Sequence, residues 1–186
     1  MVASTVRQPK TYEDYLQTPD DGQRYELIDG EIVASPSGTK RHQYISGRLS
    51  SWLFLYVEQL GLGKVFSAPM DVRLDRDLVV QPDIVFVRKG SPADNPDDQI
   101  IVGAPALAVE ILSPSTAVRD LNRKREIYEH YGVEEYWIID PERKTLMAFT
   151  LGESGYSPVR SLAGNLRSKS IPGLVVNLTA LFQDIF

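Results

Sequence analysis

Apolar and polar positions repeat along the chain with two different periods, which divide it into helices and strands. In two long stretches apolar residues recur every three or four positions, and each stretch is followed by a glycine, Gly61 or Gly132, as is typical of helix ends. Alternating or continuous apolar runs predict strands. Helices are expected at 42–61 and about 115–131, with shorter ones within 11–23 and 179–186; strands are expected within 24–38, 64–74, 78–87, 106–113, 135–140 and 145–151, followed by a last short pair.

The order of these elements predicts the fold class. A hairpin, in which Asp29-Gly30 suits a type I′ turn, precedes a helix, three strands, a second helix and further strands. This order indicates an α/β or α+β protein with a central mixed sheet flanked by helices. We expect a single domain over 1–186, with residues 1–10 as a flexible arm and a polar loop at 88–99 long enough to border a site.

Composition narrows the class of protein. With 42% hydrophobic and 24% charged residues among 186, the chain has the profile of a soluble globular domain. It has no cysteine, which excludes disulfides and thiolate sites, and no apolar run long enough to span a membrane, so we expect a cytoplasmic protein. The net charge of −5 disfavours binding of polyanions by the whole surface, but leaves room for a local basic patch.

Glu110 interrupts the apolar strand run ALAVEIL and is the first candidate for chemistry. Strand alternation places it on one face with Ala108 and Leu112, whereas Val109 and Ile111 point to the other face. A buried carboxylate must be paired, protonated or bound to a metal ion. The strand alone leaves a structural ion pair and a functional site equally open.

Asp83 interrupts the preceding apolar run, VVQPDIVFV, in the same way. We expect it on a strand, sharing a face with Gln81 and Val85, near Glu110. Two carboxylates that converge from neighbouring strands make an oxygen-ligand site for Mg²⁺ or Mn²⁺, in which waters and phosphate oxygens fill the remaining positions.

The helix after Glu110 brings a lysine to the same region. Leu121, Lys124, Tyr128 and Tyr131 form one helical stripe, so Lys124 lies on the inward face. The residues leave two interpretations open: a lysine whose stem packs on apolar neighbours, or a cation that neutralises charge beside a bound phosphate.

Several of these segments together carry a family resemblance. YELIDGEI, PDIVFV, VEILSPST, the spacing of Asp120, Lys124 and Tyr128, and GVEEYWIIDP are similar to the Uma-type restriction endonuclease family of the PD-(D/E)XK nuclease superfamily. The match runs from about Tyr25 to Pro141. One departure is that Leu112 stands where the superfamily's simplest pattern has a lysine, two residues beyond Glu110.

The resemblance implies a restriction-endonuclease-like fold and a role for each candidate. It implies that Asp83, Glu110 and the main-chain carbonyl of Ile111 bind Mg²⁺, and that Lys124 replaces the missing lysine. It further implies supporting roles for two acids: Asp120 would orient Lys124 or a neighbouring arginine, and Glu26 would be an extra ligand, unless Glu26 is simply an exposed hairpin residue.

Other polar residues near the site have simpler interpretations. His42, beside two basic residues, is a possible phosphate contact, although a helix-end position without a catalytic role explains it as well. Ser113–Thr116 lacks the partners of a nucleophile and fits a helix cap. Tyr128 and Trp137 fit the core.

The resemblance therefore implies a Mg²⁺-dependent endonuclease acting on DNA, with Mn²⁺ as a substitute ion, and the placement of the charged residues is compatible with it. Two alternatives remain: a non-catalytic member of the same fold that binds nucleic acid or protein, and a hydrolase of another phosphoester. A homodimer is expected for cutting both strands of a duplex.

Overall fold

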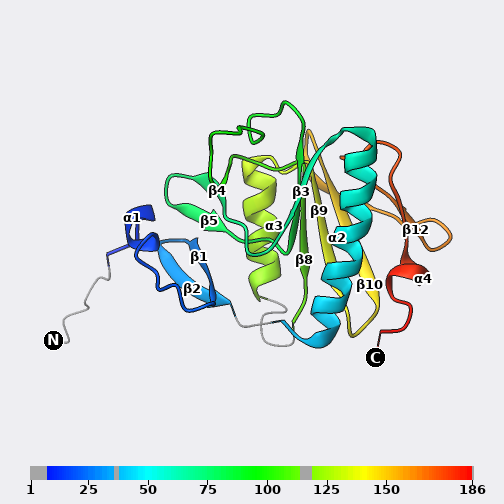
Figure 1. Ribbon diagram of the computed structural model, residues 1–186, viewed down its shortest axis with the longest axis horizontal. Coiled ribbons are helices and arrows are strands. Elements are labelled where there is room, and N and C mark those ends of the chain that lie inside the picture. The colour runs from blue at the N-terminus through cyan, green and yellow to red at the C-terminus, as the bar shows by residue number, and fades with distance from the viewer. Residues whose placement is uncertain (1–7, 36–37, 114–118, 186) are drawn as a thin grey trace.

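A computed structural model of the chain describes residues 8–35, 38–113 and 119–185, with side chains after the second gap described from Asn122 onward (Figure 1). The helices are α1 (Tyr12–Tyr15), α2 (Lys40–Leu60), α3 (Arg119–Tyr131) and α4 (Leu178–Leu181). The strands are β1 (Arg24–Ile28), β2 (Glu31–Ser35), β3 (Gly63–Ser67), β4 (Val72–Asp75), β5 (Leu78–Val80), β6 (Ile84–Arg88), β7 (Ile101–Val102), β8 (Leu107–Ile111), β9 (Glu135–Asp140), β10 (Thr145–Gly152), β11 (Gly155–Val159), β12 (Asn165–Arg167) and β13 (Val175–Asn177).

The strands of the described segments form three sheets. The largest has the order β11-β10-β9-β8-β6-β3, and its β8–β9 pair is parallel while its other pairs are antiparallel. A second sheet has the order β2-β1-β5-β4-β7, and β12 and β13 form a small third one. The expected mixed sheet with flanking helices, and with it the fold class, is confirmed.

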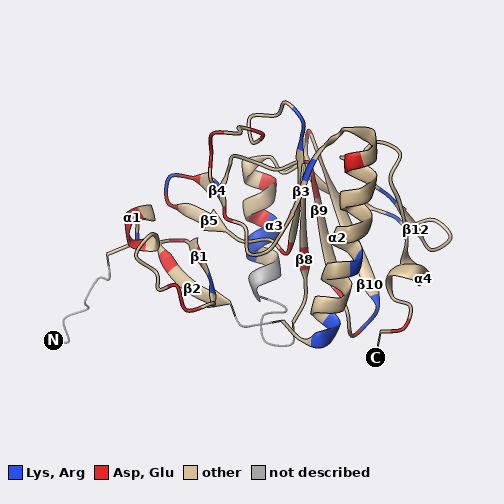
Figure 2. Ribbon diagram, viewed as in Figure 1, with Lys and Arg blue, Asp and Glu red and all other residues tan. Residues whose placement is uncertain are grey.

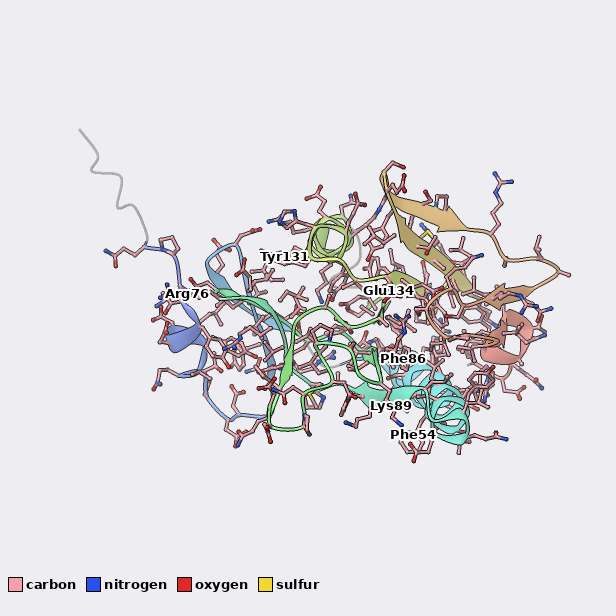
Figure 3. All side chains as sticks on the ribbon, turned by 90° about the horizontal axis from the view of Figure 1, so that it is seen from above. Phe54, Arg76, Phe86, Lys89, Tyr131 and Glu134 are labelled. Carbon is pink, nitrogen blue, oxygen red and sulfur yellow. The ribbon has the colours of Figure 1, made fainter. Side chains whose placement is uncertain are left out.

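The six-stranded sheet is covered on both faces. On one face, Ile45, Leu49, Leu53 and Val57 of α2 pack with alternate residues of the sheet and with the C-terminal segment. On the other face, α3 and the second sheet pack against the remaining alternate residues, such as Ala108. The figures agree on this arrangement, with α2 and α3 on opposite sides of the sheet (Figures 1 and 3). Because β8 lies inside, all five of its residues are buried, as the continuous apolar run predicts.

Local chemistry explains where these elements begin and end. Thr39 caps α2 by accepting a hydrogen bond from the His42 N–H, and Gly61 ends that helix at φ 61°, a left-handed conformation that glycine adopts without steric cost. In the first hairpin, Asp29 and Gly30 both have positive φ, as a type I′ turn requires. The predicted end of the first long helix at Gly61 and the predicted type I′ turn at Asp29-Gly30 are both confirmed.

The segment between α2 and β8 differs from the prediction. The two expected strands at 64–74 and 78–87 are each interrupted, near Pro69 and Pro82, and their halves belong to different sheets. Proline has no N–H to donate to a strand ladder, which explains both interruptions. Asp83 therefore lies just before β6 and not on a strand, so the expected common face with Gln81 and Val85 was wrong.

Two further features bear on function. The polar loop at 88–99 follows the end of β6 that is opposite Asp83, so it does not border the acids.

Among the described helices, none is both long enough and apolar enough to cross a membrane.

Candidate functional site

Glu110 projects from β8 toward α3. It shares its face with Ala108, as strand alternation predicts, and is 9% exposed. Its Oε1 accepts hydrogen bonds from Lys124 Nζ at 2.9 Å and from the Tyr128 hydroxyl at 2.7 Å. Lys124 and Tyr128 are four residues apart on α3, so one face of that helix supplies both donors.

Lys124 joins Glu110 to a second acid. Its Nζ also lies 2.9 Å from Glu26 Oε1, and that oxygen accepts a 2.7 Å hydrogen bond from the Gln81 N–H. Glu26 is on β1 of the second sheet and is 5% exposed, so the interpretation of Glu26 as an exposed hairpin residue was wrong. Lys124 thus connects the two large sheets through one ammonium group.

Asp83 has its own set of donors. Its Oδ2 accepts a 2.8 Å bond from the Ile111 N–H and lies 3.0 Å from His42 Nε2, while its Oδ1 accepts a 2.9 Å bond from Arg24. These donors come from β8, α2 and β1. The Ile111 contact places Asp83 one residue from Glu110 along β8, so the structure brings the two predicted acids together although Asp83 is not on a strand.

Burial and these partners shift the pKa values in different directions. Burial raises the pKa of Glu110 to about 7, against the opposing effect of Lys124, and the charges of Asp83 and Glu26 raise it further. Burial alone would raise the pKa of Asp83 as well, but His42, Arg24 and the Ile111 N–H lower it below its usual range. Burial alone would lower the pKa of Lys124, yet Glu110 and Glu26 raise it. Lys124 is therefore protonated near neutral pH.

Three residues contribute more than the sequence indicates. Tyr128 lies in the core as expected, but its hydroxyl is also a partner of Glu110. His42 is in the first turn of α2, as the helix-end interpretation expects, and its buried side chain is in addition a partner of Asp83. Arg24 had no predicted role; the signal that could have revealed it is its position two residues before Glu26, because alternate residues of a strand share a face.

Part of the predicted site lies outside the described residues. The backbone of α3 is described at Asp120, but the Asp120 side chain is not, so its orienting role stays a prediction. The expected cap at Ser113–Thr116 falls mostly within 114–118, also outside the described residues. The contact between His42 and a phosphate, and the Ile111 carbonyl as a ligand, likewise stay predictions.

The chemistry of the donor set fits Mg²⁺. The carboxylates of Asp83 and Glu110 are hard oxygen ligands, and Mg²⁺ in proteins usually takes one or two carboxylates and keeps several waters. Within the described segments, no group of three or more histidines and acids is arranged so that it could hold a metal ion. A site here would thus rest on two carboxylates and non-protein oxygens.

Comparisons with known proteins place this chain in a family. The model of the Uma2 family, described as "Putative restriction endonuclease", matches residues 12–180. A protein of Synechocystis sp., the uncharacterised slr1290, is 33% identical over 122 residues, a segment that spans 63% of this chain and 61% of that protein.

A solved structure supports the same fold. The crystal structure of a "putative nuclease belonging to DUF820" from Anabaena variabilis superposes with a TM-score of 0.78 at 21% identity, over 94% of this chain and 98% of the other. With this common fold, and with a family model that covers most of its length, the chain belongs to the Uma2 family of restriction-endonuclease-like proteins.

Proposed function

We propose that the protein is a Mg²⁺-dependent endonuclease that hydrolyses DNA phosphodiester bonds at the site formed by Asp83, Glu110 and Lys124. The observation that supports it most is the buried ammonium group of Lys124, which lies between Glu26 and Glu110. A third acid, Asp83, is hydrogen-bonded to the N–H of Ile111, the residue that follows Glu110 on β8. The family description and the name of the Anabaena structure point to the same activity.

In this proposal Asp83, Glu110 and the Ile111 carbonyl would hold the ion. Bound Mg²⁺ would polarise the phosphoryl oxygens and lower the pKa of a coordinated water. Mn²⁺ has the same preference for oxygen ligands and would substitute.

The protein's own residues have complementary tasks. Lys124 is protonated, so it can donate hydrogen bonds to an attacking water or a phosphate oxygen but cannot accept a proton. Tyr128 and Lys124 fix the orientation of Glu110, while His42, Arg24 and the Ile111 N–H fix that of Asp83. Positions fixed before substrate binding reduce the entropy lost in reaching the transition state.

Cleavage assays test the proposal. Purified protein is incubated with supercoiled, linear and single-stranded DNA in Mg²⁺ or Mn²⁺, beside Asp83→Asn and Lys124→Gln. We expect cleavage by the wild type, abolished by EDTA, and a loss of about a hundredfold or more in each variant. Glu153→Gln, an exposed acid remote in sequence, serves as the matched control. Cleavage that survives in both site variants would show that the site is wrong.

One observation favours a second candidate, a non-catalytic member of the fold that binds nucleic acid or protein. Each of the three acids at the candidate site already has a cationic or histidine partner: Lys124 for Glu26 and Glu110, and Arg24 with His42 for Asp83. Such pairing also suits a purely structural network. DNA binding without cleavage under any of the metal conditions would support this candidate.

The predicted homodimer belongs to the same proposal, because two sites related by a two-fold axis suit cleavage of both strands. Sedimentation equilibrium with and without duplex DNA would measure it.

A further inference from the structure

Four exposed or half-exposed basic residues lie at one end of the six-stranded sheet. Lys40 and Arg41 open α2, and Arg143 and Lys144 are in the turn between β9 and β10. A side-chain ion pair between Arg41 and Glu142 joins these two places. We call these four residues the basic rim. Figure 2 shows its two halves at the lower ends of α2 and β10.

The basic rim lies at the same end of the sheet as the candidate site. β8 and β9 are parallel, and Ile111 is in register with Ile139, so both strands end where the β9–β10 turn begins. From the other half of the rim, His42 follows Arg41 directly and its side chain contacts Asp83. The rim is therefore adjacent to the site through two separate elements.

Two of the four charges are available to a ligand. Arg41 is paired with Glu142, and Arg143 lies 3.7 Å from Asp140. Lys40 and Lys144 are exposed, and within the described segments neither makes an ion pair. The rim thus carries a local positive charge on a chain whose net charge is −5.

Two features of the backbone add to this. The first turn of α2 contains no acidic residue of its own, so the partial positive charge of the helix N-terminus has the same sign as the charges of Lys40 and Arg41. Lys144 has φ 52°, a left-handed conformation that lysine adopts rarely and glycine or asparagine more easily. This conformation belongs to the turn that enters β10, and the Lys144 side chain there is exposed.

We propose that the basic rim is the surface on which the phosphate backbone of DNA docks, with Lys40 and Lys144 as direct phosphate contacts on either side of the site. This inference rests on the proposed function and adds the binding surface. The positive charge of the rim is complementary to the DNA backbone, because the duplex presents one negative charge per about 1.7 Å of helix axis.

Fluorescence anisotropy with a short labelled duplex in EDTA tests the surface separately from cleavage. The variants are Lys40→Ala, Lys144→Ala and the double charge reversal Lys40→Glu/Lys144→Glu, titrated between about 50 and 200 mM salt. Each alanine variant should reduce the slope of log K against log salt by about 1. The double reversal should weaken binding at least about tenfold.

The matched control is Lys89→Glu/Lys169→Glu, which changes the net charge equally at the far end of the sheet; both side chains are exposed, and the Lys169 N–H donates to Glu135 at the start of β9. Figure 3 looks onto that end and labels Lys89, which lies six residues beyond Asp83, about 20 Å along an extended strand. That distance exceeds the Debye length of about 10 Å at 0.1 M salt. The control should therefore bind within about twofold of the wild type.

The outcomes separate the two proposals. Weak binding by the rim variants alone supports the surface. Equal weakening by rim and control variants overturns it, since only net charge would then matter. Rim variants that bind and cleave like the wild type overturn the surface and leave the proposed function standing. A wild type that binds no DNA overturns both. Circular dichroism and thermal unfolding confirm that each variant is folded.

Discussion

At the scale of single residues, Lys124 determines how two acidic groups, Glu26 and Glu110, are tolerated near the middle of the protein. A lysine this buried is stable as a cation only because Glu110 and Glu26 both lie 2.9 Å from it. Removing one member of a buried ion pair leaves the partner's charge without compensation. This is more destabilising than replacing both members by apolar residues of similar size.

Lys124→Met keeps most of the side-chain volume and removes the charge. We expect it to lower the free energy of unfolding by about 3 to 5 kcal/mol, measured by urea denaturation. Lys89→Met, at an exposed site, should change it by less than about 0.5 kcal/mol. The double variant Lys124→Met/Glu110→Gln should recover part of the loss, because one uncompensated acid is gone. Equal effects of Lys124→Met and Lys89→Met would contradict the burial of this charge.

Glu110 gives stability a pH dependence of unusual sign for an acid. Its pKa is about 7 in the folded protein and close to 4.5 when unfolded. Between these values the folded state binds the proton and the unfolded state does not, so the contribution of Glu110 to stability decreases as pH rises from 4.5 to 7. A shift of this size corresponds to about 3 kcal/mol. Lys124 stays protonated throughout this window, so its own contribution is constant.

Denaturation at several pH values isolates this effect when the wild type is compared with Glu110→Gln. The wild type should lose about 3 kcal/mol relative to the variant between pH 4.5 and 7, and the two curves should run parallel above 7. Parallel curves over the whole range would mean that the pKa of Glu110 is not raised.

At the scale of elements, a buried acid outside the candidate site, Glu135, organises the C-terminal part. Glu135, the first residue of β9, is fully buried, and its hydrogen-bond partners within the described segments are all neutral donors. These donors are Trp137 Nε1, the Ser168 and Ser170 hydroxyls, and the N–H groups of Lys169 and Ser170, at 2.6 to 2.9 Å. The carboxylate thus fixes the segment between β12 and β13 against the large sheet.

Glu135→Gln replaces one of the two accepting carboxylate oxygens with an NH₂ group, which donates. All the partners of Glu135 are donors, so the NH₂ group faces another donor. We expect a loss of about 2 to 4 kcal/mol in unfolding free energy, because at least one N–H or O–H is left unpaired. Hydrogen exchange should rise first in 165–177. The neighbouring Glu134→Gln alters an exposed pair with Arg88 and should change stability by less than about 1 kcal/mol. Unchanged exchange in 165–177 would show that Glu135 does not hold this segment.

The helices and strands also show how much of the structure could be predicted from the sequence. The two long helices, the first hairpin and the buried strand β8 follow from local periodicity and turn chemistry, and these were predicted well. The division of strands between two sheets was not, because a proline interruption does not reveal which sheet each half joins. Glu110 and Lys124 could be paired because strand and helix phase restrict where each points. Strand alternation puts Arg24 and Glu26 on one face of β1, but their contacts with Asp83 and Lys124 depend on the packing of one sheet on the other, which local periodicity does not encode.

At the scale of the whole molecule, the candidate site joins the two large sheets. Arg24 and Glu26 come from β1 of the second sheet, Asp83 immediately precedes β6 of the six-stranded sheet, Glu110 is on β8 of that sheet, and Lys124 is on α3. Any ligand bound at this point contacts parts of the fold that are far apart in sequence. Binding there should consequently stabilise the folded protein as a unit.

Thermal unfolding with and without Mg²⁺ or Mn²⁺ tests this expectation without measuring activity. An ion at about 100 times its dissociation constant adds about 2.7 kcal/mol, which for a protein of this size corresponds to a rise in Tm of about 5 to 10 °C. Asp83→Asn should abolish the rise, and Glu153→Gln should retain it. Lys124→Met should show a larger rise than the wild type, although its Tm without metal is lower, since the ammonium group and the metal ion compete for the charge of Glu110. If the metal raises the Tm of the wild type and of Asp83→Asn equally, the ion is bound elsewhere. If it raises the Tm of Lys124→Met less than that of the wild type, the lysine assists metal binding and does not oppose it.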